Sequence, residues 1–314
     1  MTNIEKYRLF CKTEENIPIF SRDWFLDSVC GLDNWDVVLV EKGDDIIASM
    51  PFYKKKKATI FTIITMPKHA QTMGVYIKYP KQEQKYERKL SYEKEIMTKL
   101  IEQLPKVDYF NQSFHYNITN WLPFYWKGYT QTTNYTYLIE NISNTEEVFK
   151  NFDNAKRRHI KRAEKIVEVK FDLPAKEFYE NHKMTLKKQN DKIAYSFEHF
   201  NRMYKSAYSK NAGKSIYAID SDGNIHAAFF VVWDKNSAYY LISTIDPSFR
   251  SSGATSLLMK KIIEFLSDKT DKFDFEGSMI EPVEKSFRQF GAKQKAYSNI
   301  TKIDSKILKH LVLL

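Results

Sequence analysis

The segment DPSFRSSGAT, residues 246–255, lies between a strand pattern at 238–243 and a helical pattern at 253–267. Its small residues leave the first backbone N–H groups of the helix free, and the helix dipole adds partial positive charge there. Arg250 adds a full charge, so this strand–turn–helix junction is a candidate phosphate site. The alternative is an ordinary helix start with Ser252 as its N-cap. Both interpretations place a strand directly before a helix, as in α/β chains.

A second segment, FDFEGSM (residues 273–279), covers the end of the next predicted strand. In a strand, alternation puts Asp274 and Glu276 on the face opposite the two phenylalanines. Two acids at the end of a strand, followed by Ser278, suit a general base or a substrate clamp. The alternative is a solvated edge strand.

A third segment, KRRHIKRAEK (residues 156–165), carries six Lys or Arg in a predicted helix. Arg157 and Lys161 share one face of this helix, while Arg158 lies on the adjoining face. This is the one real cluster of basic residues in the chain, and its functional interpretation is contact with phosphate or RNA. A solvated helix is the other interpretation.

Composition sets the broad class. The chain has 314 residues, of which 43% are hydrophobic and 28% charged, so collagen, disordered and coiled-coil classes are excluded. The net charge of +10 favours anionic partners, although an AT-rich coding bias also explains part of the lysine excess. The longest apolar stretch, residues 58–66, is shorter than the roughly 20 residues of a membrane span, and the first residues contain no secretory signal. With only two cysteines, we expect a cytoplasmic protein.

The two halves of the chain share segments in the same order, which predicts a duplicated unit of about 150 residues. The matching pairs are FYWKGYTQ (124–131) with FRQFGAKQ (287–294), YFNQS (109–113) with DFEGS (274–278), and residues 43–48 with 223–227. Each unit reads as helix, antiparallel strands, helix, strand, helix, strand. This order indicates a mixed α/β sheet rather than a doubly wound one. We place the domains at 1–139 and 140–314.

Several familiar motifs are absent. No GxGxxG follows a strand, and no GxSxG elbow occurs. The seven histidines form no HxxH or HExxH pair, so we expect no dedicated metal site.

With these segments located, the chain resembles the tandem members of the GNAT acyltransferase superfamily, and among them the Fem-like proteins. The resemblance runs through residues 135–303, and the first half is similar only as a degenerate copy. It rests on the basic helix, the 246–254 junction, and the pair of segments DFEGS (274–278) and FRQFGA (287–292). It implies two tandem GNAT-like domains from an internal duplication.

The resemblance also implies site residues. In GNAT enzymes a loop [QR]-x-x-G-x-[GA] holds the pyrophosphate of coenzyme A (CoA). The matching residues of this chain are Arg250, Ser251, Ser252, Gly253, Ala254 and Thr255. Thr255 stands where the family has Gly or Ala, and Phe287 stands where many members have a tyrosine that acts as the general acid.

The implied reaction is attack by an amine on an acyl thioester, with Glu276 as base or amine clamp, Asp274 second, and Ser278 as a hydrogen-bonding group. The leading prediction is acyl transfer from acyl-CoA to a cell-envelope or amino-sugar amine. The alternative is a Fem-type transfer from aminoacyl-tRNA to a peptidoglycan precursor, with Arg157, Arg158 and Lys161 binding the nucleic acid or the precursor diphosphate. A non-catalytic binding protein of the same fold is the third prediction.

Overall fold

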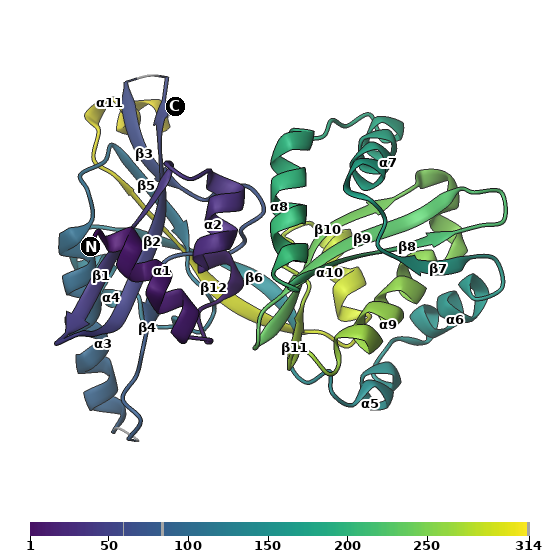
Figure 1. The fold of residues 1–314 in the computed structure, drawn as a ribbon, viewed down its shortest axis with the longest axis horizontal. Helices are drawn as coiled ribbons and strands as arrows, with labels where there is room; N and C mark the ends of the chain where they lie inside the picture. Colours follow the sequence, from purple (N-terminus) through teal and green to yellow (C-terminus); the bar gives the residue numbers. More distant parts are fainter. Residues whose placement is uncertain (59, 83–84, 313–314) are drawn as a thin grey trace. The chain divides into compact units, whose positions relative to one another are not determined.

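The computed structural model describes residues 1–58, 60–82 and 85–312, and it divides into two compact units. The first unit is Met1–Asn134 with Ala296–Leu314, and the second is Tyr135–Lys295. The predicted domains, 1–139 and 140–314, differ from these units, because the units divide after Asn134, within strand β6 (Thr130–Ile139), and the C-terminal segment groups with the first unit. Figure 1 shows the elements with their labels.

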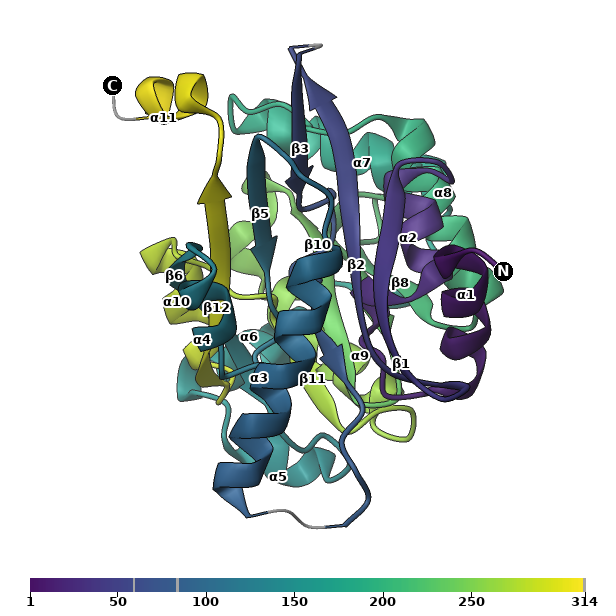
Figure 2. The same cartoon turned by 90° about the vertical axis from the view of Figure 1, so that its left-hand side faces the viewer.

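The first unit contains a sheet with helices on both faces. Its elements are α1 (Asn3–Thr13), η1 (Ile19–Ser21), α2 (Asp23–Cys30), β1 (Trp35–Lys42), β2 (Asp45–Lys57), β3 (Phe61–Thr65), β4 (Tyr76–Ile77), α3 (Tyr86–Gln103), β5 (Tyr109–Ser113), α4 (Leu122–Trp126) and α11 (Lys306–Val312). The strand order is β1-β2-β3-β5-β12, with β3 and β5 parallel and β4 paired to β2. Helix α3 packs on one face through Ile96 and Leu100 (Figure 2), while Tyr7 of α1 contacts Trp35 on the other.

The second unit has the same layered arrangement. Its elements are α5 (Thr145–Lys150), α6 (Asn154–Ala163), β7 (Glu168–Phe171), α7 (Ala175–Lys188), α8 (Phe197–Ser209), β8 (Gly213–Ile219), β9 (Ile225–Trp233), β10 (Ser237–Ile245), η2 (Pro247–Ser252), α9 (Ala254–Leu266), β11 (Lys272–Asp274) and α10 (Glu281–Arg288). The strand order is β6-β11-β10-β9-β8-β7. Helices α7 and α8 cover one face of this sheet, and α9 covers the other (Figure 1).

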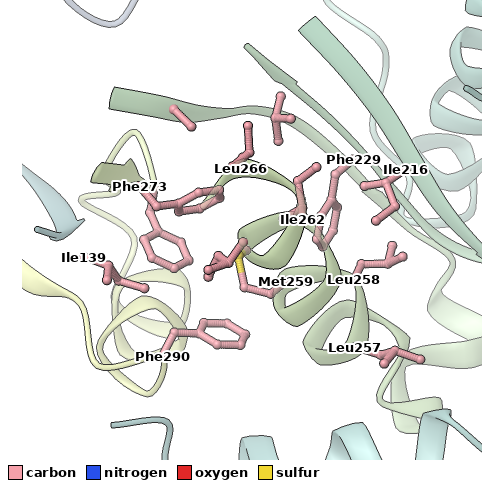
Figure 3. Packing of buried hydrophobic residues seen from close by; sticks show 14 of the residues in the cluster. Ile139, Ile216, Phe229, Leu257, Leu258, Met259, Ile262, Leu266, Phe273 and Phe290 are labelled. Carbon is pink, nitrogen blue, oxygen red and sulfur yellow. The ribbon is translucent and has the colours of Figure 1, made fainter. Parts of the chain in front are cut away.

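The core of the second unit lies between α9 and the sheet. Leu258, Ile262 and Leu266 recur every four residues along α9, so they form one apolar stripe, and all three are fully buried. They pack near Phe229 of β9 and Phe273 of β11 (Figure 3). Each such side chain contributes about 2 kcal/mol on burial, so this layer holds the strands next to the candidate site in place.

Both units repeat one order of elements, helix–helix–strand–strand–strand–helix–strand–helix–strand, which confirms the expected mixed α/β fold class. The glycines of the matching segments occupy equivalent turns. Gly128 follows α4 with φ +82°, and Gly291 follows α10 with φ +78°. The last strand of each repeat is exchanged: β6 (Thr130–Ile139), which follows α4, pairs with β11, and β12 (Lys293–Ile303), which follows α10, pairs with β5.

Candidate functional site

The parallel strands β10 and β11 separate after three residue pairs. Their register runs from Ser237↔Lys272 to Tyr239↔Asp274, while β10 continues to Ile245. A register shift between Tyr239 and Ile242 marks a bulge, which bends β10 at this point. From Tyr240 onward this edge of β10 pairs with no strand in the described part of the chain. Its backbone N–H and C=O groups are therefore available to an extended ligand.

A pocket of about 500 Å³ lies along this edge of β10. Its walls come from β10 (Tyr240, Ser243), α7 (His182, Thr185), η2 and α9 (Arg250, Thr255, Met259), and α10 with the turn after it (Ser286, Phe287, Phe290). The lining is mainly apolar with a few polar groups, as in sites that bind small molecules or cofactor arms.

The predicted phosphate loop meets this pocket in part. Arg250 and Thr255 line the pocket, and the Arg250 guanidinium also donates to Gln189 of α7. Gly253 faces away from it, with φ +85°, and a Cβ there would lie 2.3 Å from the carbonyl oxygen of His159. Glycine is therefore required because α6 packs directly on the loop.

The other loop residues stabilise the junction. The N-cap of α9 is Gly253 rather than the expected Ser252, whose hydroxyl lies one residue earlier and accepts from the N–H of Ala254 at 3.2 Å. Arg162 of α6 donates to the carbonyl oxygen of Ser251 at 2.6 Å. The junction is thus fixed to α6 on one side and open to the pocket on the other.

The structure brings Asp274 and Glu276 together in a buried position. Strand β11 ends at Asp274, and Glu276 adopts φ +60°, so strand alternation does not govern their placement. Asp274 Oδ1 accepts from the Thr136 hydroxyl and, at 2.7 Å, from the N–H of Glu276. The second carboxyl oxygen of Asp274 and Oε1 of Glu276 are buried without a hydrogen-bond partner. Unpartnered buried oxygens of this kind are open to a proton or to a ligand donor.

Burial raises the pKa of both carboxyl groups. It raises the pKa of Asp274 to about 7, and the donors on Oδ1 only partly oppose this while Asp234 adds to it. Burial, with the neighbouring Asp274, raises the pKa of Glu276 well above its ordinary value. Both carboxyl groups therefore favour their protonated form more than an exposed acid does, and Asp274 titrates near neutral pH.

The pair lies where the strands separate. Phe273 and Phe275 point into the core with α9, so Asp274 lies on the opposite face of the sheet, beside Tyr239. The next residue of β10, Tyr240, lines the pocket. The acids and the pocket thus both lie near the beginning of the open edge, although neither acid lines the pocket.

Ser278 has a local role in the structure. Its hydroxyl accepts from the N–H of Ile280 at 3.0 Å, in the turn before α10. The side chain does not line the pocket along β10.

The three basic residues predicted on α6 lie on its exposed surface and do not line the pocket. Arg157 donates to the carbonyl oxygen of Lys150 at 3.1 Å and to Asn154 at 2.6 Å, while Arg158 and Lys161 face solvent. Lys156 is the basic residue of this run that points inward, and the sequence pattern did not distinguish it from the others.

The sequence analysis also missed Tyr240. Its hydroxyl hydrogen-bonds with Ser243, and burial raises its pKa, so the phenol is protonated at neutral pH. Its ring centroid lies 6.4 Å from that of Phe287, the residue that replaces the expected tyrosine. With 20 tyrosines in the chain, an aromatic residue in an apolar strand carries no signal of function.

The residues that the structure describes contain no ready-made site for a cofactor metal. Among the residues that the structure describes, no group of three or more His, Cys, Asp or Glu is arranged to hold a metal ion. No helix of the described chain is long and apolar enough to cross a membrane.

Comparisons with known proteins agree with this geometry. The family model of the acetyltransferase (GNAT) domain matches residues 150–279, which include the junction and the acid pair. A search of curated proteins finds no match. Among solved structures, FemX is similar over 100% of this chain and 99% of its own, with a TM-score of 0.74 and 11% identity.

Two further structures share the fold. L-PGS from Bacillus licheniformis has a TM-score of 0.57 and 10% identity, and the match covers 98% of this chain and 95% of that protein. A tandem GNAT protein from the clavulanic acid biosynthesis pathway has a TM-score of 0.50 and 6% identity, with coverage of 95% and 93%. At such identities the similarity concerns the fold.

Proposed function

Because the chain has a Fem-like tandem GNAT fold, we propose that its second unit transfers an acyl group from acyl-CoA to a primary amine of a cell-envelope or amino-sugar acceptor. The observation that carries this proposal is the open edge of β10, with a pocket along it and an acid pair with buried, unpartnered oxygens at its beginning. Both cysteines, Cys11 and Cys30, are free thiols, in keeping with a cytoplasmic enzyme.

The donor would lie along β10 with its thioester at the bulge. A backbone N–H of the open edge stabilises the oxyanion that forms when the amine attacks the acyl carbon. Arg250 and the N-terminus of α9 face the phosphate end of the pocket. The new C–N bond forms as the C–S bond breaks.

Two proton transfers complete the reaction. Asp274, with a pKa of about 7, accepts the proton that the attacking ammonium loses. Tyr240 in the pocket wall donates a proton to the departing thiolate, in place of the tyrosine absent at Phe287. Glu276, whose N–H donates to Asp274, is the amine clamp of this proposal, with Ser278 as a nearby hydrogen-bonding group.

Thermal unfolding with a concentration series of acetyl-CoA tests the proposal. A ligand at 100 times its Kd adds about 2.7 kcal/mol, which raises the midpoint by several degrees in a protein of this size. A saturable rise that Tyr240→Phe preserves, together with slower turnover in that variant, supports the donor site and the acid. A flat response up to millimolar acetyl-CoA would overturn the acyl-CoA proposal.

The exposed basic face of α6 favours a second candidate, transfer from aminoacyl-tRNA. Arg158 and Lys161 are available there for phosphate contacts. RNA affinity that falls steeply with salt, and that is lost when Arg157, Arg158 and Lys161 are all changed to Gln, would support this candidate. RNA affinity that is unchanged in the triple variant would exclude α6 as the contact.

A further inference from the structure

The inward face of α6 carries a buried cation. Lys156 is 8% exposed, and its Nζ donates to the Ser286 hydroxyl at 2.8 Å. The same Nζ lies 4.3 Å from the ring centroid of Phe290. Ser286 and Phe290 both line the pocket along β10. The ammonium group is therefore one hydroxyl group away from the pocket.

This ammonium has no carboxylate partner in the part of the chain that the structure describes. A buried cation without a carboxylate in contact carries a large desolvation penalty, which a single hydroxyl, an aromatic ring and the more distant charge of Asp153 offset only in part. Burial accordingly lowers the pKa of Lys156 to about 8. A leucine or methionine would fill the same space without the penalty, so the charge calls for a partner that the free protein lacks.

Other positive groups lie at the same pocket. The guanidinium of Arg250 lines it, and Thr255 in the first turn of α9 marks the positive end of that helix. Because Gly253 lets α6 pack against the loop at His159, the helix that carries Lys156 is fixed next to this junction.

We propose that Lys156 is the counter-charge for a phosphate group of the acyl donor, acting through Ser286. Nζ donates to Oγ of Ser286, and the hydroxyl proton of Ser286 is then free to be donated to a phosphate oxygen in the pocket. The inference rests on the proposed function, since it takes the diphosphate of CoA as the bound group.

The charges around Lys156 are few. On its own helix, Asp153 raises and burial lowers its pKa, and the pKa of nearby His159 is itself lowered by burial and by cations. Helix α10 presents an uncharged hydroxyl and ring, while Glu284 and Arg288 pair with each other. Donor affinity should therefore be constant below pH 8 and fall above it, as the lysine loses its proton.

Calorimetric titration of the full chain with CoA, and separately with pantetheine, tests the inference. We expect Lys156→Met to weaken CoA binding at least tenfold at pH 7 and to leave pantetheine binding unchanged. The loss of CoA affinity between pH 7 and 9.5 should disappear in this variant. Lys165→Met, at an exposed position after α6, should stay within twofold of the wild type. Should Lys156→Met fail to fold, Ser286→Ala interrupts the same contact.

Each outcome separates the two proposals. Equal CoA affinity in the wild type and Lys156→Met overturns this inference and leaves the donor proposal standing. If the wild type binds no CoA, the donor proposal fails, and inorganic pyrophosphate becomes the probe. Pyrophosphate binding that Lys156→Met removes would then uphold a phosphate site for another donor, whereas no pyrophosphate binding would overturn the inference as well.

Discussion

The two units have the same order of elements but treat the ends of their parallel strands differently. In the second unit, β10 runs past the end of β11 and leaves an open edge with a pocket. In the first unit, the chain closes the equivalent place. The N–H of Met73 bonds the carbonyl oxygen of Ser113 at 2.7 Å, and the sulfur of Met66 accepts from the N–H of Ser113.

Glycine marks how tightly the first unit is closed. A Cβ on Gly74 would lie 2.8 Å from the ring of Phe114, so the segment after β3 is pressed against the end of β5. The residue at the position of Asp274 also differs between the two units. Tyr109, paired with Ile63, stands where the second unit has Asp274 paired with Tyr239. The same fold thus has closed strand ends in the first unit and an open edge with a pocket in the second.

The largest expected effect comes from the acid at the open edge. Asp274→Asn keeps an oxygen for the two donors at Oδ1 but removes the base, so we expect acyl transfer to fall by roughly 10²–10⁴-fold. Steady-state kinetics with an amine acceptor measures this. Tyr109→Phe at the equivalent place in the first unit is the control and should stay within twofold. A similar loss in both variants would contradict the assignment of the site to the second unit.

The junction between β10 and α9 depends on the close contact of Gly253 with the backbone of α6. A comparison of substitutions at two glycines tests this contact. Gly253 and Gly223 have nearly equal φ values of +85° and +84°, but only Gly253 meets neighbouring backbone. We expect Gly223→Ala to lower the free energy of unfolding by about 1–2 kcal/mol and Gly253→Ala by about 4 kcal/mol. Urea denaturation measures both. Equal losses would mean that α6 does not brace the loop.

Filling the pocket should separate binding from folding. Ser243→Phe places a ring in the pocket along β10, and we expect donor affinity to fall by about 10–100-fold by calorimetry. Thr65→Phe is the matched change in the first unit, where the side chain lines a different cavity against Lys55. Donor affinity that falls equally in both variants would show that the pocket is not the donor site.

The smallest effect concerns stability and pH. The pKa of Asp274 is raised to about 7 in the folded chain from 3.8, so the folded state holds this proton across that interval and the unfolded state does not. Stability from this group is full below pH 3.8 and is lost as the pH rises toward 7. Between pH 5 and 7 the wild type should lose roughly 2 kcal/mol relative to Asp274→Asn. Urea denaturation of both proteins at several pH values checks the sign, and a wild type that gains stability relative to Asp274→Asn as the pH rises would contradict it.

Local pattern was enough to identify much of the fold. Apolar periodicity located most helices and strands, and the repeated segments predicted the common order of elements because equivalent turns need glycine at equivalent places, as at Gly128 and Gly291. The sequence did not predict strand β7, because only one of its four side chains is half-buried and the others are exposed. The strand therefore shows no alternation. The exchange of β6 and β12 also had no sequence signal, since the residues of a strand do not record which strand they pair with.

The tandem α/β organisation, the basic helix and the two acids follow from the sequence, because each depends on neighbouring residues. Only the tertiary structure decided their chemistry. The pKa of Asp274 depends on burial, with Thr136 and Asp234 brought beside it from other strands. The inward position of Lys156 depends on how α6 packs against the loop at Gly253. Desolvation and packing arise from residues distant in the chain, and no local pattern records them.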